Sequence, residues 1–114
     1  MDINFNYVHV KASTRLEEVV TEKINKLKTR FDFLVGAEVY FKTENSSSTD
    51  EGRICEIKLS LPGPLVFASA NEENFDMAIS KCTNEIKTQL QKRKEKMQLE
   101  KYNQKWKFLK QKLK

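Results

Sequence analysis

The chain of 114 residues contains only two cysteines, one histidine, three glycines and two prolines, and this scarcity excludes several classes of protein. Cys55 and Cys82 form no CxxC motif and have no histidine at metal-ligand spacing, so we expect neither a disulfide framework nor a metal site. Three isolated glycines do not make a phosphate-binding loop. The sequence therefore predicts two reduced cysteines that act as small core residues, and no cofactor.

The sequence also lacks the residues of a catalytic centre. The only histidine, His9, falls in a predicted strand without a neighbouring nucleophile, and the carboxylates are dispersed along the chain. No HExxH, GxSxG or Walker-type motif occurs. We therefore expect a protein that is not an enzyme and that has no small-molecule substrate.

Long apolar runs are missing as well. The runs present are only a few residues long, far short of a membrane span, and the N-terminal sequence MDINFNYVHV has no features of a signal peptide. The length suits one domain with a core of its own. The sequence thus predicts a cytoplasmic protein without a membrane partner.

What the chain has in excess is positive charge, and this charge is concentrated toward the C-terminus. Residues 81–114 hold 12 Lys and Arg against 3 Asp and Glu, whereas residues 1–80 hold 9 against 13. A cationic segment concentrates polyanions and replaces the counterions condensed on a phosphate backbone. Nucleic acid is therefore the first partner to consider, ahead of an anionic membrane surface or an acidic protein.

Alternating apolar and polar residues predict strands over residues 3–7, 37–42, 55–61 and 65–70. The first of these continues past His9, but Val8 and Val10 fall on the other parity, so the strand is either covered on both faces or bulged near Tyr7. The stretch Thr43–Gly52, TENSSSTDEG, has no apolar residue and predicts a mobile hairpin tip.

A first helix is predicted between the first two strands. Ser13 or Thr14 can cap it, and Thr14 with Glu17 has the spacing of a capping box. Apolar residues then recur every three or four positions as far as Phe31, which gives one apolar stripe about four turns long.

A second helix is predicted after the last strand, with Asn71 or Asn74 as its cap. Its core-facing stripe ends at Leu90, where a run of basic residues begins, so we expect the helix to leave the core there. A second apolar stripe with spacings of three and four residues follows, at Leu99, Tyr102, Trp106, Leu109 and Leu113.

The resulting β-α-β-β-β-α order predicts an α+β fold, a two-layer sandwich with two helices packed on one face of a four-stranded sheet and a basic helical C-terminal tail. We divide the chain into a β-α-β-β-β-α domain, residues 1–97, and a basic amphipathic C-terminal extension, residues 98–114. The topology resembles double-stranded-RNA-binding folds, although a fold alone does not establish a function.

Two rows of basic residues on the predicted helices form the candidate polyanion surface. One row lies on the first helix at i, i+3 and i+7, facing away from the sheet, and the other surrounds the end of the second helix, facing solvent. Lysine-rich rows favour contact with phosphates over reading of base edges, although one such row alone is usually a solvated charged face. The candidate RNA-binding residues are Lys23, Lys26, Arg30, Lys87, Lys92, Arg93, Lys94 and Lys96.

The stretch Phe67–Met97, FASANEENFDMAISKCTNEIKTQLQKRKEKM, resembles the ribosome hibernation-promoting factor and ribosome-associated inhibitor family. The ASA of the fourth strand, the QL pair and the KxKxK spacing match that family. The first strand, the Ser/Thr cap and the helix ending in KLxxxF are similar too. Within this resemblance, which covers about residues 1–97, the family's basic positions correspond to Lys23, Lys26, Lys92, Lys94 and Lys96.

The resemblance implies a short-form factor that binds the small ribosomal subunit and its rRNA. It would lie between head and body in the mRNA and tRNA channel near the decoding centre, where it silences stored ribosomes in stationary phase or stress. Ribosomal proteins lining the channel would be further partners. A dimerisation domain like that of the long form is missing, and the basic tail places the chain nearer the hibernation-promoting branch than the inhibitor branch.

This chain departs from the family pattern at two places. Asn74, Phe75 and Asp76 replace the usual Asp-Met-Tyr run, which implies altered capping and packing. Thr88 stands at a frequently basic position, which implies one lost phosphate contact.

The C-terminal extension leaves an alternative open. Tyr102, Trp106 and Phe108 interleave with lysines, which suits stacking on bases or an anionic lipid interface. The same stripe would also suit packing back on the domain or pairing with a second copy, although it covers only about two heptads. The alternative function is a protein- or membrane-interaction module that acts through this tail.

Overall fold

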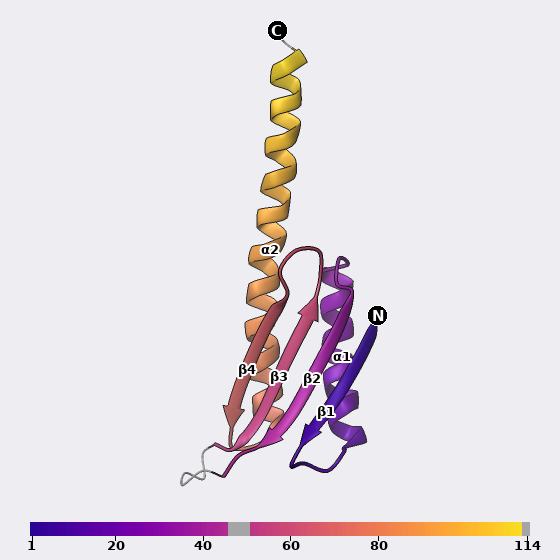
Figure 1. The fold of residues 1–114 in the computed structure, drawn as a ribbon, viewed down its shortest axis with the longest axis vertical. Helices are drawn as coiled ribbons and strands as arrows, with labels where there is room; N and C mark the ends of the chain where they lie inside the picture. The colour runs from indigo at the N-terminus through magenta and orange to yellow at the C-terminus, as the bar shows by residue number, and fades with distance from the viewer. Residues whose placement is uncertain (46–50, 113–114) are drawn as a thin grey trace.

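Four strands and two helices follow one another in the predicted order in the computed structural model, which describes residues 1–45 and 51–112 (Figure 1). Both helices cover the same face of the sheet, which confirms the predicted two-layer α+β fold. Residues 46–50, within the predicted hairpin tip, lie outside the described residues. The elements are β1 (Asp2–Val8), α1 (Thr14–Arg30), β2 (Gly36–Thr43), β3 (Arg53–Ser60), β4 (Val66–Glu72) and α2 (Phe75–Lys112).

The sheet has its strands in the order β1-β2-β3-β4. β1 and β2 are parallel because α1 crosses over between them, whereas the later strands are antiparallel neighbours. Every second residue of the inner strands points toward the helices and is buried, as Val39 and Phe41 of β2 illustrate. In the part of the chain that the structure describes, no element covers the opposite face of the sheet (Figure 1).

The end of β1 differs from both sequence-based alternatives. Its pairing with β2 is unbroken from Asp2 to Val8, so the strand has no bulge near Tyr7. Val8 is 39% exposed, so the strand is not covered on both faces either. The strand ends because His9 adopts a φ of 58°, in the left-handed region that a strand does not enter.

The core lies between the sheet and the two helices. Ile79, Ile86 and Leu90 of α2 are fully buried. Among the later residues of α2 whose side chains the structure describes, none is buried. Cys55 and Cys82 are buried free thiols, as predicted. A hydrogen bond with Cys82 and burial raise the pKa of the Cys55 thiol, which keeps it protonated and unreactive.

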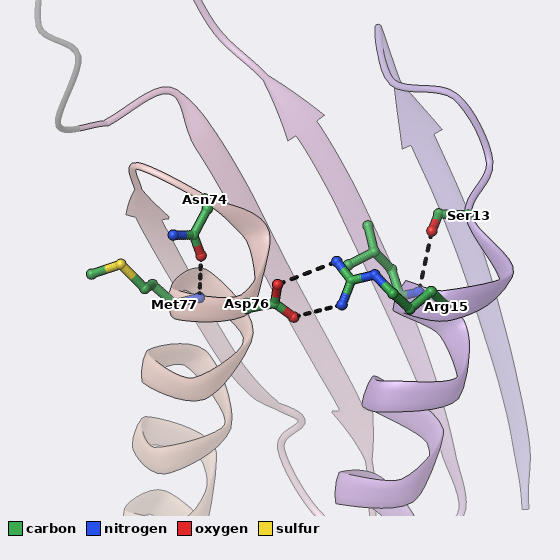
Figure 2. A network of polar contacts seen from close by, with 6 residues as sticks. Ser13, Arg15, Asn74, Asp76 and Met77 are labelled. Atoms are coloured by element: carbon green, nitrogen blue, oxygen red, sulfur yellow. Dashed lines mark hydrogen bonds and ion pairs between the residues drawn. The ribbon is translucent and has the colours of Figure 1, made fainter.

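Each helix begins at a polar cap that one of the predicted alternatives supplied. The Ser13 hydroxyl oxygen accepts a 3.2 Å hydrogen bond from the backbone N–H of Leu16. The Asn74 amide oxygen accepts a 2.9 Å hydrogen bond from the backbone N–H of Met77 (Figure 2). The predicted Thr14–Glu17 capping box is wrong, because Ser13 is the cap and Glu17 instead accepts a hydrogen bond from the Tyr7 hydroxyl.

An ion pair joins the beginnings of the two helices. The guanidinium of Arg15 donates to both carboxylate oxygens of Asp76, at 3.0 and 3.2 Å (Figure 2). This hydrogen bond raises the pKa of Arg15. Both side chains are exposed, so the pair contributes little stability, although it links the first turns of α1 and α2.

The last half of α2 projects away from the domain (Figure 1). The helix continues past residues 97 and 98 without a break, so the division of the chain there stays a prediction. Leu99 and Tyr102 are 59% and 65% exposed, which shows that the prediction of a stripe packed back on the domain is wrong for these two residues. The side chains of Trp106, Phe108 and Leu109, and all of Leu113, lie outside the described residues.

We expect truncation after Met97 to leave the domain folded. Of the removed residues, 98–104 have described side chains and none of these belongs to the core, so the melting temperature should change by less than about 4 °C. Thermal unfolding of the full chain and the truncated chain, followed by circular dichroism, measures this change. A larger drop would show that the C-terminal segment stabilises the domain and that our division of the chain is wrong.

Candidate RNA-binding surface

A basic groove runs between α1 and α2 on the side away from the sheet. On α1, Lys23, Lys26 and Arg30 lie on the flank next to α2, because spacings of three and four residues keep them on one side of the helix. Lys87 of α2 lines the same groove, together with Thr83 and Asn84. Residues of the two predicted rows therefore meet in one groove.

The groove continues along α2 toward the projecting part of the helix. Arg30 and Lys87 line this second section as well, where they are joined by Lys92, Thr88 and Glu95. The structure thus brings five of the eight predicted residues together on one helical face. These five, which we call the groove cations, are Lys23, Lys26, Arg30, Lys87 and Lys92.

Most of the groove cations are available for an external anion. Within the described residues, Lys23, Lys87 and Lys92 have no ion pair or hydrogen bond to another side chain. Lys26 pairs with Glu22 one turn earlier at 3.3 Å, with both side chains more than two-thirds exposed. An exposed ion pair of this kind contributes little free energy, so a phosphate can compete with Glu22 for Lys26.

Arg30 is held in place more firmly than the lysines. Its guanidinium carbon lies 5.3 Å from the centre of the Phe31 ring, and it donates a 2.8 Å hydrogen bond to the amide oxygen of Gln91 on α2. A guanidinium that is already oriented loses less side-chain entropy when it binds a phosphate. Sequence reasoning missed Gln91, because only the packing of α2 beside α1 brings it near Arg30.

Lys94 and Arg93 differ from the predicted pattern. Lys94 was expected to face solvent, but it is half-buried, donates to the carbonyl oxygen of Arg30 at 3.4 Å and lies 5.7 Å from the Phe31 ring. The cause is the free carbonyl groups at the end of α1, which attract a donor. Arg93 donates to the carbonyl of Pro62 in the β3–β4 turn. Any contact of these two residues with RNA stays a prediction.

Lys96 is exposed, as expected, but lies beyond the groove. It follows Lys92 by one turn and therefore shares that face of α2. It lines neither section of the groove, so we expect it to add a phosphate contact along the projecting helix.

We expect Lys94→Gln to destabilise the domain by about 1 kcal/mol, because it removes the charged donor at the end of α1 and its contact with Phe31. Urea unfolding measures this change. Lys96→Gln is the matched control, since it removes the same charge from an exposed position and should leave stability within about 0.5 kcal/mol of the original. Equal effects of the two substitutions would contradict a role for Lys94 in joining the helices.

The open face of the sheet has a different electrostatic character from the groove. Lys42 pairs with Glu56 at 2.7 Å, and the Tyr40 hydroxyl donates to Glu38 at 3.1 Å, which raises the pKa of Tyr40. Lys58 lies 5.9 Å from the Tyr40 ring. Acidic and basic groups alternate here, so this face does not concentrate polyanions as the groove does.

Among the helices that the structure describes, none is long and apolar enough to cross a membrane. The groove itself is open and polar, and its lysines point to an extended anionic partner rather than to an enclosed small molecule.

Comparisons with known proteins indicate one family. The profile of the family described as "Sigma 54 modulation protein / S30EA ribosomal protein" matches residues 3–106. A ribosome hibernation promoting factor of Pseudomonas putida is 31% identical over 98 residues, which cover 86% of this chain and 91% of the relative.

Two solved structures have the same fold. A ribosomal subunit interface protein from Coxiella burnetii aligns with a TM-score of 0.72 and 21% identity, over 82% of this chain and 98% of its own. The N-terminal domain of Protein Y from Thermus thermophilus aligns with a TM-score of 0.68 and 20% identity, over 81% of this chain and 98% of its own.

Proposed function

Because the chain belongs to the Sigma 54 modulation protein / S30EA ribosomal protein family, we propose that it is a ribosome hibernation factor. It binds the small ribosomal subunit and inactivates translation in stationary phase or stress. The observation that carries this proposal is the convergence of the five groove cations on one face of the helices, away from the sheet.

The groove suits rRNA because it offers several cations at fixed positions without an enclosing wall. Each lysine that meets a phosphate releases condensed counterions, and several such contacts add in free energy. Lysine heads recognise phosphates rather than bases, so the contact depends on the shape of folded RNA more than on its sequence. Arg30, oriented by Phe31 and Gln91, is suited to hold one phosphate through two parallel hydrogen bonds.

We place the binding site in the channel for mRNA and tRNA near the decoding centre, where ribosomal proteins that line the channel would be further neighbours. A folded domain lodged there excludes mRNA and tRNA sterically. Inhibition therefore needs no bond to be broken. The support for this location is the family resemblance together with the basic groove.

The test is binding to purified ribosomal subunits, followed by translation in a purified system. We expect cosedimentation with the small subunit that weakens steeply as salt is raised, and inhibition that follows occupancy. Prebound mRNA and tRNA should reduce binding, because they fill the same channel. Binding only to the large subunit, inhibition without occupancy, or rRNA cleavage or nucleotide hydrolysis by the purified protein would each contradict the proposal.

A further inference from the structure

The projecting part of α2, residues 96–112, which we call the distal helix, carries an apolar stripe on the same side as the basic groove. Leu99 follows Leu90 by nine residues, which is about two and a half turns, so it lies opposite the core-facing side of the helix. Thr88 and Glu95 line the groove. Leu99 follows Thr88 by about three whole turns and Tyr102 follows Glu95 by about two, so Leu99 and Tyr102 lie on the same side of the helix as the groove. A particle bound in the groove therefore also faces this stripe.

The two members of the stripe whose side chains are described have no cover within the described chain. Leu99 and Tyr102 are more than half exposed, and the distal helix extends away from the sheet and from α1 (Figure 1). The backbone is helical as far as Lys112, so positions 99, 102, 106 and 109 recur at the three- and four-residue spacing of one helical side. Apolar side chains at this spacing are the anchors of a helix that docks in a groove or beside another helix.

The positions that flank the stripe indicate the charge of the partner. We assign positions 99 and 102 to the apolar a and d positions of a heptad repeat. The e and g positions that flank the stripe between residues 96 and 112 then hold no acidic residue. Two copies of this helix would therefore place lysine opposite lysine, which opposes self-association. A partner with acidic flanks would meet the lysines favourably, and the lysines at these positions are Lys96, Lys105, Lys110 and Lys112.

We propose that the distal helix docks on a ribosomal protein, through an apolar groove or helix that is edged by Asp and Glu side chains. This inference rests on the proposed function, because the partner belongs to the particle that the basic groove binds. RNA suits the lysines and its bases can stack on Tyr102, but RNA offers no apolar pocket for the aliphatic side chain of Leu99. An acidic amphipathic protein surface suits both the lysines and Leu99.

The short length of the stripe fits a contact made after the groove has bound. About two heptads are too few to hold two free helices together. Once the groove is bound, however, the distal helix is tethered beside its partner at an effective concentration in the millimolar range, as for a short linker. A weak helix contact then lengthens residence on the ribosome without new contacts elsewhere.

Site-specific photo-crosslinking in the full chain tests the identity of the partner. Leu99→p-benzoylphenylalanine, bound to purified small ribosomal subunits, should crosslink to a ribosomal protein at a segment where Asp or Glu flanks apolar residues. Gln104→p-benzoylphenylalanine is the matched control, because its exposed position lies across the helix from Tyr102 and should crosslink poorly. Crosslinks from position 99 to rRNA, to a second copy, or to nothing would overturn the proposal.

Affinity measurements test the apolar nature of the contact. Leu99→Ala with Tyr102→Ala should lower affinity for small subunits about tenfold, by the same factor at low and high salt, because apolar burial is not screened. Unchanged affinity would overturn this inference while leaving the proposed function intact. Failure of the unsubstituted chain to bind small subunits would instead overturn the proposed function.

Discussion

Reversing the charge of three groove cations together is expected to lower affinity for small ribosomal subunits by about 100-fold or more at moderate salt. The substitutions are Lys26→Glu, Lys87→Glu and Lys92→Glu. All three side chains are exposed, so the fold should survive. Each lost phosphate contact reduces the salt dependence of binding, and the slope of log affinity against log salt should fall by about three. Cosedimentation at several salt concentrations, with circular dichroism as a check on folding, measures both effects.

The matched control makes the same change of net charge elsewhere. Lys11→Glu, Arg53→Glu and Lys58→Glu alter three exposed cations outside the groove, and affinity should stay within a few-fold of the original. If both triple variants lose affinity equally, the overall charge rather than the groove determines binding. Full binding by the groove variant would show that the proposed surface is wrong.

The largest effect on stability is expected from Phe41→Ala, which should lower the free energy of unfolding by about 3–5 kcal/mol. Phe41 is fully buried, and its ring centre lies 5.5 Å from that of Tyr7 and 5.7 Å from that of Phe75. The side chain therefore joins β1, β2 and the first turn of α2, and its removal leaves a cavity where these elements meet. Urea unfolding measures the change.

Phe67→Ala serves as the control for this substitution. Phe67 has the same chemistry but lies on the open face of the sheet and is 42% exposed, so its loss should cost less than about 1.5 kcal/mol. A cost for Phe41→Ala as small as that for Phe67→Ala would mean that the core is not centred where we place it.

The sequence predicted the elements well because their signals are local. Period-two alternation marked the strands, and the stripe that ends at Leu90 marked the limit of the core. The capping-box prediction failed at Glu17, because the Tyr7 hydroxyl of β1 donates a hydrogen bond to the Glu17 carboxylate instead. The end of β1 was missed because the backbone angle of His9 leaves no periodic signal.

The candidate site was predicted only as two separate rows of basic residues. Their meeting in one groove depends on how α1 and α2 lie side by side, which no local pattern specifies. The same packing turns Lys94 inward to the end of α1, although its spacing matches that of exposed Lys92 and Lys96. Charge patterns in the sequence thus marked the two helices that form the groove, but they could not separate the cations that line the groove from those that contact the fold.

The unbroken course of α2 has a consequence for insertions and deletions. Loops usually accept a change of length, but one residue added between Leu90 and Leu99 would rotate everything beyond it by about 100° and advance it by about 1.5 Å. Seven added residues would nearly restore the orientation while moving the end of the helix outward by about 10 Å. The number of residues in this segment is therefore as much a determinant of where the C-terminal side chains point as their identities are.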